Sequence, residues 1–342
     1  MRGGLLTKFN HNQNTTTMSN FNSILEGITY TNTGEYSRGQ VLPYHHKPNP
    51  LKKNKSPFAA DVIGLKPVDR RRAIMSTQDG HESKFTIGIE VEKNSFHRNA
   101  VKEYPLFCGF ERDGSCGYEA VTHILPLLPE GKWRNKVFDL FVQAEKIIDS
   151  RYSPADRRCG GHITVSCKGM TSDDLRKALR PFCGIIHALF EKRMQNGYCN
   201  GNLRMQANYE RDHVNGAGYG GSPKYKFALE KSFNDGLGSE GIEFRVVSRF
   251  ESVKQTIRRY ELFYALLDTA VNAPNTSHET FLKRIRPIVV SMYGGNEADA
   301  ELRIEKARHY RRFILTGKLS SLIARVIDPH QRHTEWWDAD AL

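Results

Sequence analysis

The chain has 342 residues, of which 39% are hydrophobic and 26% are charged, and its formal net charge is +12. No apolar stretch approaches the length that crosses a bilayer, so the composition indicates a globular protein and excludes a membrane-spanning one. The positive charge favours partners that carry phosphate groups, such as nucleotides or nucleic acid. The six cysteines form no C-x-x-C pair and the N-terminus lacks a secretory signal pattern, so we expect a cytoplasmic protein without a structural zinc site.

Residues 1–82 are rich in Asn, Thr, Ser, Gly and Pro and show no sustained hydrophobic periodicity. Such segments bury too little apolar surface to offset the entropy that is lost on ordering. We therefore predict a polar, basic N-terminal extension that is disordered or bound to a partner. Its basic runs, "LKKNK" at 51–55 and "DRRR" at 69–72, would be solvated or would contact nucleic acid or a larger assembly.

The segment 83–275 shows the periodicities of strands and helices and is predicted to form the central domain. Alternating apolar and polar residues predict strands in "FTIGIEVEK" (85–93), "CGGHITVSC" (159–167) and "GIEFRVVSRF" (241–250). The stretch 109–127 indicates a hairpin around a "DGS" turn. Apolar spacing predicts helices over 134–150, 171–194 and 251–272, the second one capped by Thr171 and broken near Pro181.

The remaining residues, 276–342, carry further helical patterns and are predicted to pack on the central domain. Strands that are mixed with helices, without an internal repeat, indicate an α+β fold. We expect a curved, mostly antiparallel sheet with flanking helices.

The first predicted strand carries two glutamates on the face opposite its apolar residues. Side chains of a strand alternate between its faces, so Glu90 and Glu92 share one face. Taken alone, this strand is explained by one face of an antiparallel sheet being exposed to solvent. The other strands repeat the design, however, and their polar faces carry Glu119, His162, Glu243, Arg245 and Arg249.

Four glutamates on one sheet face would repel one another unless cations lay between them. Carboxylates with a single imidazole suit Mg²⁺ or Mn²⁺ better than zinc. The arginines could then hold a phosphate or a carboxylate through paired hydrogen bonds. The pattern therefore predicts a divalent-metal site for phosphoryl transfer rather than a solvent-exposed face.

Five short motifs, "GIEVE", "DGSCGYEAVT", "CGGHITV", "KYKFAL" and "IEFRVVSRF", follow one another between residues 83 and 275. In this order they resemble the amidoligase family of the glutamine synthetase-like carboxylate–amine ligases. The resemblance implies a glutamine synthetase-like catalytic domain that joins a carboxylate to an amine, peptide or protein substrates included, through an acyl-phosphate made from ATP.

The resemblance also implies roles for particular residues. The ligands of Mg²⁺ or Mn²⁺ would be Glu90, Glu92, Glu119, His162 and Glu243. Arg245 would stabilise the transferring phosphoryl group, with Glu243 and Arg249 also in the catalytic set, and Tyr225 would lie with Arg245 at the ATP site. Two departures from the family pattern are Thr122-His123 in place of Ser-Pro, and Thr164 in place of a second histidine.

Three other interpretations compete with this one. "GAGYGG" (216–221) matches a dinucleotide fingerprint but follows a polar segment, so a surface loop or a lid over the site is favoured. Cys159 and Cys167 flank His162, but their apolar setting favours buried thiols over a nucleophile pair. A non-catalytic binding or structural protein of the same fold, contacting nucleic acid or an assembly through its basic extension, would not need Glu90, Glu92 and Glu243, and all three are present.

Overall fold

The computed structural model of the chain describes residues 66–69, 74–76, 82–96, 106–113, 115–122, 124–196, 198–199, 201–206, 226–232 and 240–327. Most of the predicted N-terminal extension therefore lies outside the described residues. Within it, the strands β1 (Lys66–Asp69), β2 (Ile74–Ser76) and β3 (Glu82–Ser83) form a small antiparallel sheet. Strand pairing thus begins before residue 83, and residue 83 is the predicted start of the central domain.

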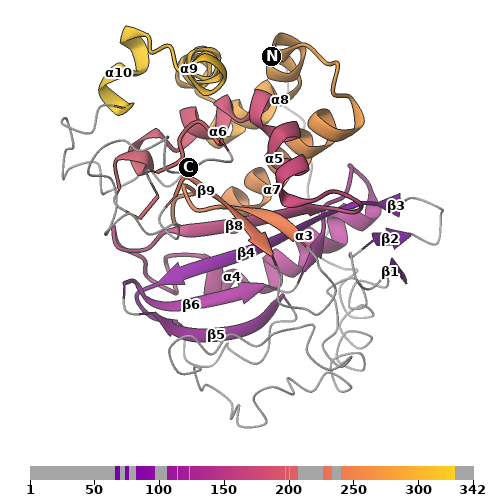
Figure 1. Cartoon of the computed structure of the whole chain (residues 1–342). Helices are drawn as coiled ribbons and strands as arrows, with labels where there is room; N and C mark the ends of the chain where they lie inside the picture. The colour runs from indigo at the N-terminus through magenta and orange to yellow at the C-terminus, as the bar shows by residue number, and fades with distance from the viewer. Residues whose placement is uncertain are drawn as a thin grey trace, which may run out of the picture.

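A seven-stranded sheet forms the centre of the molecule (Figure 1). Its strand order is β5-β6-β4-β8-β10-β9, with β7 paired to β4, and every pairing is antiparallel. The strands are β4 (Phe85–Lys93), β5 (Phe107–Asp113), β6 (Gly117–Thr122), β7 (Leu125–Pro126), β8 (Gly161–Cys167), β9 (Ala228–Ser232) and β10 (Glu240–Phe244). An antiparallel sheet with helices outside it confirms the α+β class.

The hairpin β5–β6 turns where the "DGS" motif predicts it. The Asp113 carboxylate accepts hydrogen bonds from the backbone N–H of Ser115 (2.6 Å) and of Cys116 (3.2 Å). This is the turn chemistry for which aspartate is favoured at such positions.

The helices also follow the predicted pattern. The α-helices are α3 (Lys132–Gln143), α4 (Glu145–Ile148), α5 (Ser172–Leu179), α6 (Gly184–Leu189), α7 (Val253–Leu267), α8 (His278–Met292), α9 (Glu297–Thr316) and α10 (Ser321–Ile327). Between them lie the short 3₁₀-helices η2 (Arg180–Phe182) and η3 (Glu191–Gln195) and the π-helical turn η5 (Asp268–Asn272). Thr171 caps α5 by accepting the Asp174 N–H at 3.1 Å, and α5 ends before Pro181. Among the described residues, none of these helices combines the length and apolarity needed to span a bilayer.

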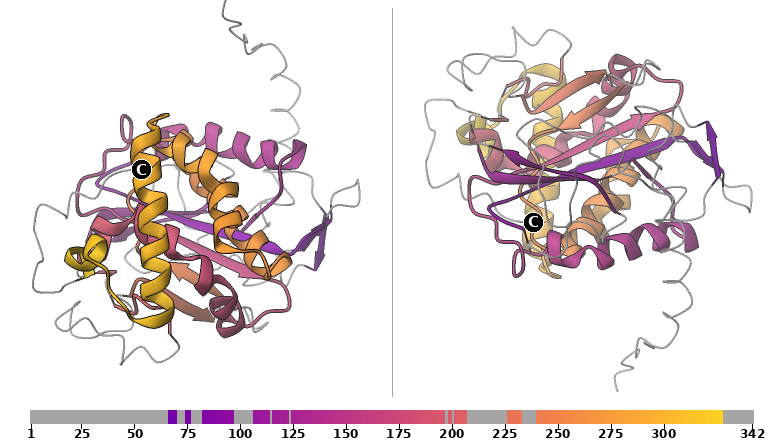
Figure 2. Two further views of the ribbon diagram at one scale, coloured as in Figure 1. Left: turned by 90° about the horizontal axis from the view of Figure 1, so that it is seen from above. Right: turned by 90° about the horizontal axis from the view of Figure 1, so that it is seen from below.

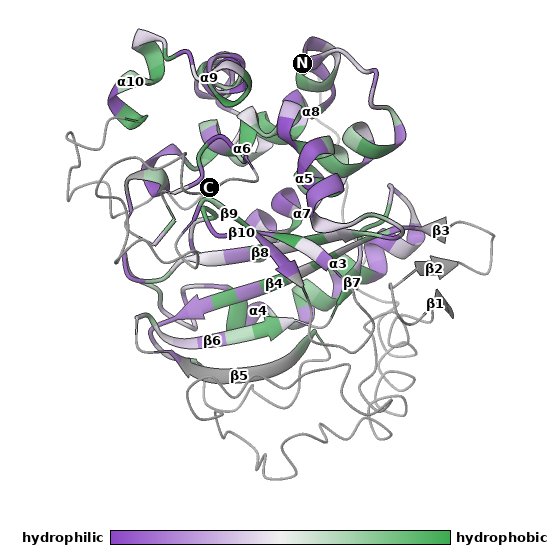
Figure 3. Ribbon diagram, in the orientation of Figure 1, coloured by the Kyte–Doolittle hydropathy of each residue, from purple (hydrophilic) through white to green (hydrophobic). Residues whose placement is uncertain are grey.

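Helix α7 packs on β4 of the sheet and also contacts α3. In Figure 1, α3 and α4 lie behind the sheet, and α5, α6, α8 and α9 lie above it. The Tyr260 hydroxyl of α7 donates to the carbonyl of Pro126 at 2.6 Å and accepts the Leu128 N–H at 2.7 Å, while its ring meets the edge of Phe138. Figure 3 shows the hydrophilic residues of β4 concentrated toward its arrowhead. This end of the strand carries Glu90 and Glu92.

Two of the C-terminal helices close the top of the molecule. Figure 2 shows α8 and α9 side by side in the view from above, and α9 also packs on α6. The contact with α6 is very close at Gly184, where an added Cβ would lie 2.3 Å from the Ala307 carbonyl oxygen. The region 276–327 is therefore built onto the central domain rather than attached as a separate body.

One predicted strand is shorter than expected. The pattern over 241–250 predicted a continuous strand, but β10 ends at Phe244 because its neighbour β9 begins opposite it, at Ala228. Beyond this point the Phe227 carbonyl accepts both the Arg245 N–H (3.1 Å) and the Val246 N–H (3.3 Å). The buried Arg259 of α7 then holds the irregular segment by donating to the Ser248 carbonyl at 2.8 Å.

Candidate metal centre

The register of three adjacent strand pairs brings the predicted polar residues together. Glu90 of β4 lies opposite His162 of β8, and Glu92 of β4 lies opposite Glu119 of β6. Glu243 of β10 pairs with Thr164, two residues along β8 from His162 and on the same face. Because paired residues of an antiparallel ladder share a face, all five side chains lie on one side of the sheet.

His162 lies at the centre of this group. Its Nδ1 is 2.6 Å from Oε2 of Glu90 and 4.0 Å from Oε1 of Glu243, and its Nε2 is 3.4 Å from Oε1 of Glu92. Glu92 and His162 are each 6% exposed, Glu119 is 5% exposed and Glu243 is fully buried. The solvent-exposed alternative is therefore wrong for these residues, which form a buried carboxylate–imidazole cluster.

Glu243 is neutralised by cations of the chain itself. Lys231 of β9 forms an ion pair with its Oε2, and Arg245 donates to its Oε1 at 2.5 Å. Burial raises the pKa of Glu243 and Glu90 raises it further, but Lys231, His162 and Arg245 together outweigh both and hold this pKa below its usual value. Glu243 is therefore an ionised carboxylate in the interior.

Glu92 receives different support. Its Oε2 accepts the backbone N–H of Gly160. The guanidinium of Arg193, from η3, lies close to the same glycine. A Cβ added to Gly160 would be 2.6 Å from an Arg193 terminal nitrogen and 3.3 Å from Oε2 of Glu92. Arg193 is only 5% exposed.

Two cations near the cluster, Lys231 and Arg193, were not predicted from the sequence. Lys231 lies beside Gly241 in the β9–β10 register, so correct pairing of these two strands would have identified it. Arg193 follows a helical segment and shares no strand pattern with the cluster, so no periodicity in the sequence indicates it.

Three buried side chains of the cluster region form a group that could hold a metal ion. Ligand atoms of Glu92, Glu119 and Cys116 all lie within 4.8 Å of one another. Two oxygens at opposite corners of a magnesium octahedron are about 4.2 Å apart, so this upper limit exceeds by about 0.6 Å the largest separation at which the two carboxylates would share one ion. Burial, reinforced by Glu92, Asp113 and Glu119, raises the pKa of the Cys116 thiol far above its usual value. Sulfur is a soft donor and a poor ligand for Mg²⁺ or Mn²⁺, so the two carboxylates are the better donors of this group.

The remaining predicted residues are placed as follows. Tyr225 and the "GAGYGG" loop lie outside the described residues. Arg249 lies in the irregular segment after β10 and donates to Glu251 at 2.5 Å, so strand alternation no longer places it on the face of Glu243. Cys159 and Cys167 are buried, and burial raises the pKa of each thiol to about 11, in keeping with buried, unreactive cysteines.

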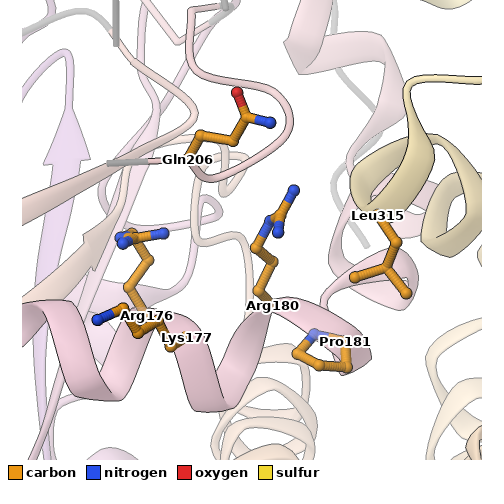
Figure 4. A pocket seen from close by; sticks show the side chains of 6 residues that line it. All are labelled: Arg176, Lys177, Arg180, Pro181, Gln206 and Leu315. Atoms are coloured by element: carbon orange, nitrogen blue, oxygen red, sulfur yellow. The ribbon is translucent and has the colours of Figure 1, made fainter. Parts of the chain in front are cut away.

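A cavity of about 300 Å³ lies elsewhere, beside α5 (Figure 4). Its lining is basic and includes Arg176, Lys177, Arg180, Pro181, Gln206 and Leu315. Arg176 already donates to Glu230 and to the Met205 carbonyl, each at 2.7 Å, and Arg180 donates to the Arg204 carbonyl at 2.7 Å. None of the predicted site residues lines this cavity, so we take the buried acidic cluster as the candidate functional site.

Comparison of the chain with models of known protein families finds no match, and comparison with curated proteins finds no similar sequence.

Proposed function

We propose that this protein is an ATP-dependent carboxylate–amine ligase with a glutamine synthetase-like catalytic domain. The observation that supports this most directly is the cluster of the buried Glu92, Glu119 and His162 with the partly exposed Glu90, beside the ion-paired Arg245. Buried carboxylates are costly unless cations compensate them. Carboxylate-held divalent ions next to a fixed guanidinium are the parts that phosphoryl transfer requires.

In the proposed reaction, a carboxylate oxygen of one substrate attacks the γ-phosphorus of ATP, the bond from that phosphorus to the bridging oxygen breaks, and ADP leaves. The amine nitrogen of the second substrate then attacks the acyl carbon, loses a proton, and releases phosphate. Divalent ions held by the cluster would neutralise charge on the phosphates. Arg245 would face the equatorial oxygens of the phosphoryl group, and Glu243 fixes its guanidinium.

Melting experiments test the metal–nucleotide site. We expect Mg²⁺ with a non-hydrolysable ATP analogue to raise the melting temperature, by an amount that grows with nucleotide concentration, since a ligand that binds only the folded state stabilises it. The double variant Glu90→Gln, Glu92→Gln should lose this shift. Glu130→Gln, which alters an exposed glutamate on the far side of the sheet, should retain it. If Mg²⁺ and nucleotide did not change the melting temperature of the wild-type protein, the proposed function would be contradicted.

Arg245→Lys separates turnover from binding. Lysine keeps the charge but loses the planar guanidinium that can meet two phosphoryl oxygens at once. We expect about a tenfold lower turnover with nucleotide affinity within about threefold of wild type. ADP release in the presence of candidate carboxylates and amines measures the first quantity, and calorimetry measures the second. Arg249→Lys is the comparison variant and should change neither quantity, because Arg249 lies beyond the end of β10 and pairs with Glu251. An unaltered turnover in Arg245→Lys would refute the role given to Arg245.

The second candidate function is a binding or structural role without turnover. It is favoured by the pairing of Glu243 with Lys231 and Arg245, because these two cations neutralise the carboxylate of a predicted metal ligand without any metal ion. The contact with nucleic acid or an assembly would be made by the basic extension, which lies mostly outside the described residues. The melting experiment distinguishes the two functions, because this one requires no response to Mg²⁺ and ATP.

A further inference from the structure

Arg193 is a buried cation that the proposed reaction has not yet used. It lies in η3, and its Nε has no hydrogen-bond partner in the described part of the chain. The turn that carries it is held firmly, because the neighbouring Glu191 accepts from Arg303, from Lys306 (2.5 Å) and from the Tyr310 hydroxyl (3.2 Å), all on α9. A buried donor without a partner is costly, and such groups in native proteins commonly mark a ligand site.

The Arg193 guanidinium lies next to a predicted metal ligand. The two distances from the Cβ position of Gly160 place a terminal nitrogen of Arg193 less than about 6 Å from Oε2 of Glu92. Arg245 is paired with Glu243, and its Nε is likewise buried without a hydrogen-bond partner in the described residues. The fully buried Cys199 is close enough to Arg193, Arg245 and Glu92 to feel the charge of all three.

A divalent ion on Glu92 would be repelled by a guanidinium at this distance unless an anion lay between them. A phosphate oxygen is such an anion, since it can bind a metal ion and accept from arginine at the same time. We infer that Arg193 and Arg245 together bind the terminal phosphate of ATP, from the Glu92 and Glu243 sides of the cluster respectively. This inference rests on the proposed function and adds Arg193 to its binding site.

The test compares two nucleotides in the full-length protein. Because Arg193 is assigned to the terminal phosphate alone, Arg193→Gln should weaken binding of a non-hydrolysable ATP analogue about tenfold and leave ADP binding within about twofold. Arg193→Lys, which keeps the charge, should lose about threefold for the ATP analogue. The matched control is Arg176→Gln, an arginine of α5 that is also 5% exposed but donates to Glu230 and to the Met205 carbonyl, and it should leave both affinities unchanged.

Gly160→Ala tests the same contact without removing the charge. Its new Cβ would displace the Arg193 guanidinium, a flexible group, so the variant should fold and still lose affinity for the ATP analogue selectively. If Arg193→Gln and Gly160→Ala weaken the binding of ADP and of the ATP analogue equally, or weaken the binding of neither nucleotide, the assignment of Arg193 is wrong while the proposed function stands. If the wild-type protein binds neither nucleotide, the proposed function itself is wrong.

Discussion

Replacing Glu243 by glutamine should lower the free energy of unfolding by about 4 kcal/mol, since breaking a buried ion pair leaves its partner charges uncompensated. Glu243 is fully buried, and Arg245, with 11% of its side chain exposed, depends on it for a counter-charge. Lys231 is 34% exposed and can recover part of its hydration, so most of the loss comes from Arg245. Chemical denaturation of both proteins measures the difference.

The control for this change is Glu130→Gln, which removes the same charge from a side chain that is 90% exposed and 3.5 Å from Arg134. It should cost about 0.5 kcal/mol or less. The pH provides a second check. The pKa of Glu243 lies below its ordinary value of 4.5, so its stabilisation is complete above that pH and is lost as the pH falls through the lower, folded-state pKa. If the difference in the free energy of unfolding between wild type and Glu243→Gln were as large in strong acid as at neutral pH, the ion-pair explanation would be contradicted.

Gly184→Ala should lower the free energy of unfolding by about 2 kcal/mol, although alanine is the better helix former. The added Cβ would lie 2.3 Å from the Ala307 carbonyl oxygen and 2.9 Å from the Arg311 backbone nitrogen. These are backbone atoms of α9, which cannot move aside unless the whole helix shifts. Overpacking of this kind costs about 3 kcal/mol, and the gain of about 1 kcal/mol in helix propensity offsets only part of it.

The matched control is Gly88→Ala in β4. A Cβ at Gly88 would meet no atom within 4 Å, so this variant should be as stable as wild type or slightly more so. Thermal denaturation of both variants gives the comparison. If Gly184→Ala were stabilising, α6 and α9 could not be packed as closely as the structure has them.

The sequence predicted the sheet and the acidic face because both depend on local alternation. In β4 and β8 the apolar residues on one face are buried against helices, and that burial fixes which face Glu90, Glu92 and His162 occupy. The hairpin and the Thr171 cap were predictable for the same reason, since each depends on side chains within a few residues.

What the sequence could not predict depends on contacts between distant segments. The end of β10 is set by where β9 begins, and Lys231 reaches Glu243 only through that pairing. Arg193 reaches the cluster because α9 holds η3 beside β8, a relation that no periodicity encodes. The burial of Glu243 likewise follows from the whole set of neighbours and not from the alternation of its own strand.

The anchoring of Glu191 by three side chains of α9 has a consequence for truncation of this protein. The motifs that suggest chemistry end before residue 276, yet the helix that steadies η3, and with it Arg193, lies beyond that residue. A chain cut at 275 would keep every carboxylate of the cluster and lose the support of its second guanidinium. The C-terminal helices are therefore part of the support of the cluster, and we expect a chain that lacks them to hold Arg193 less firmly.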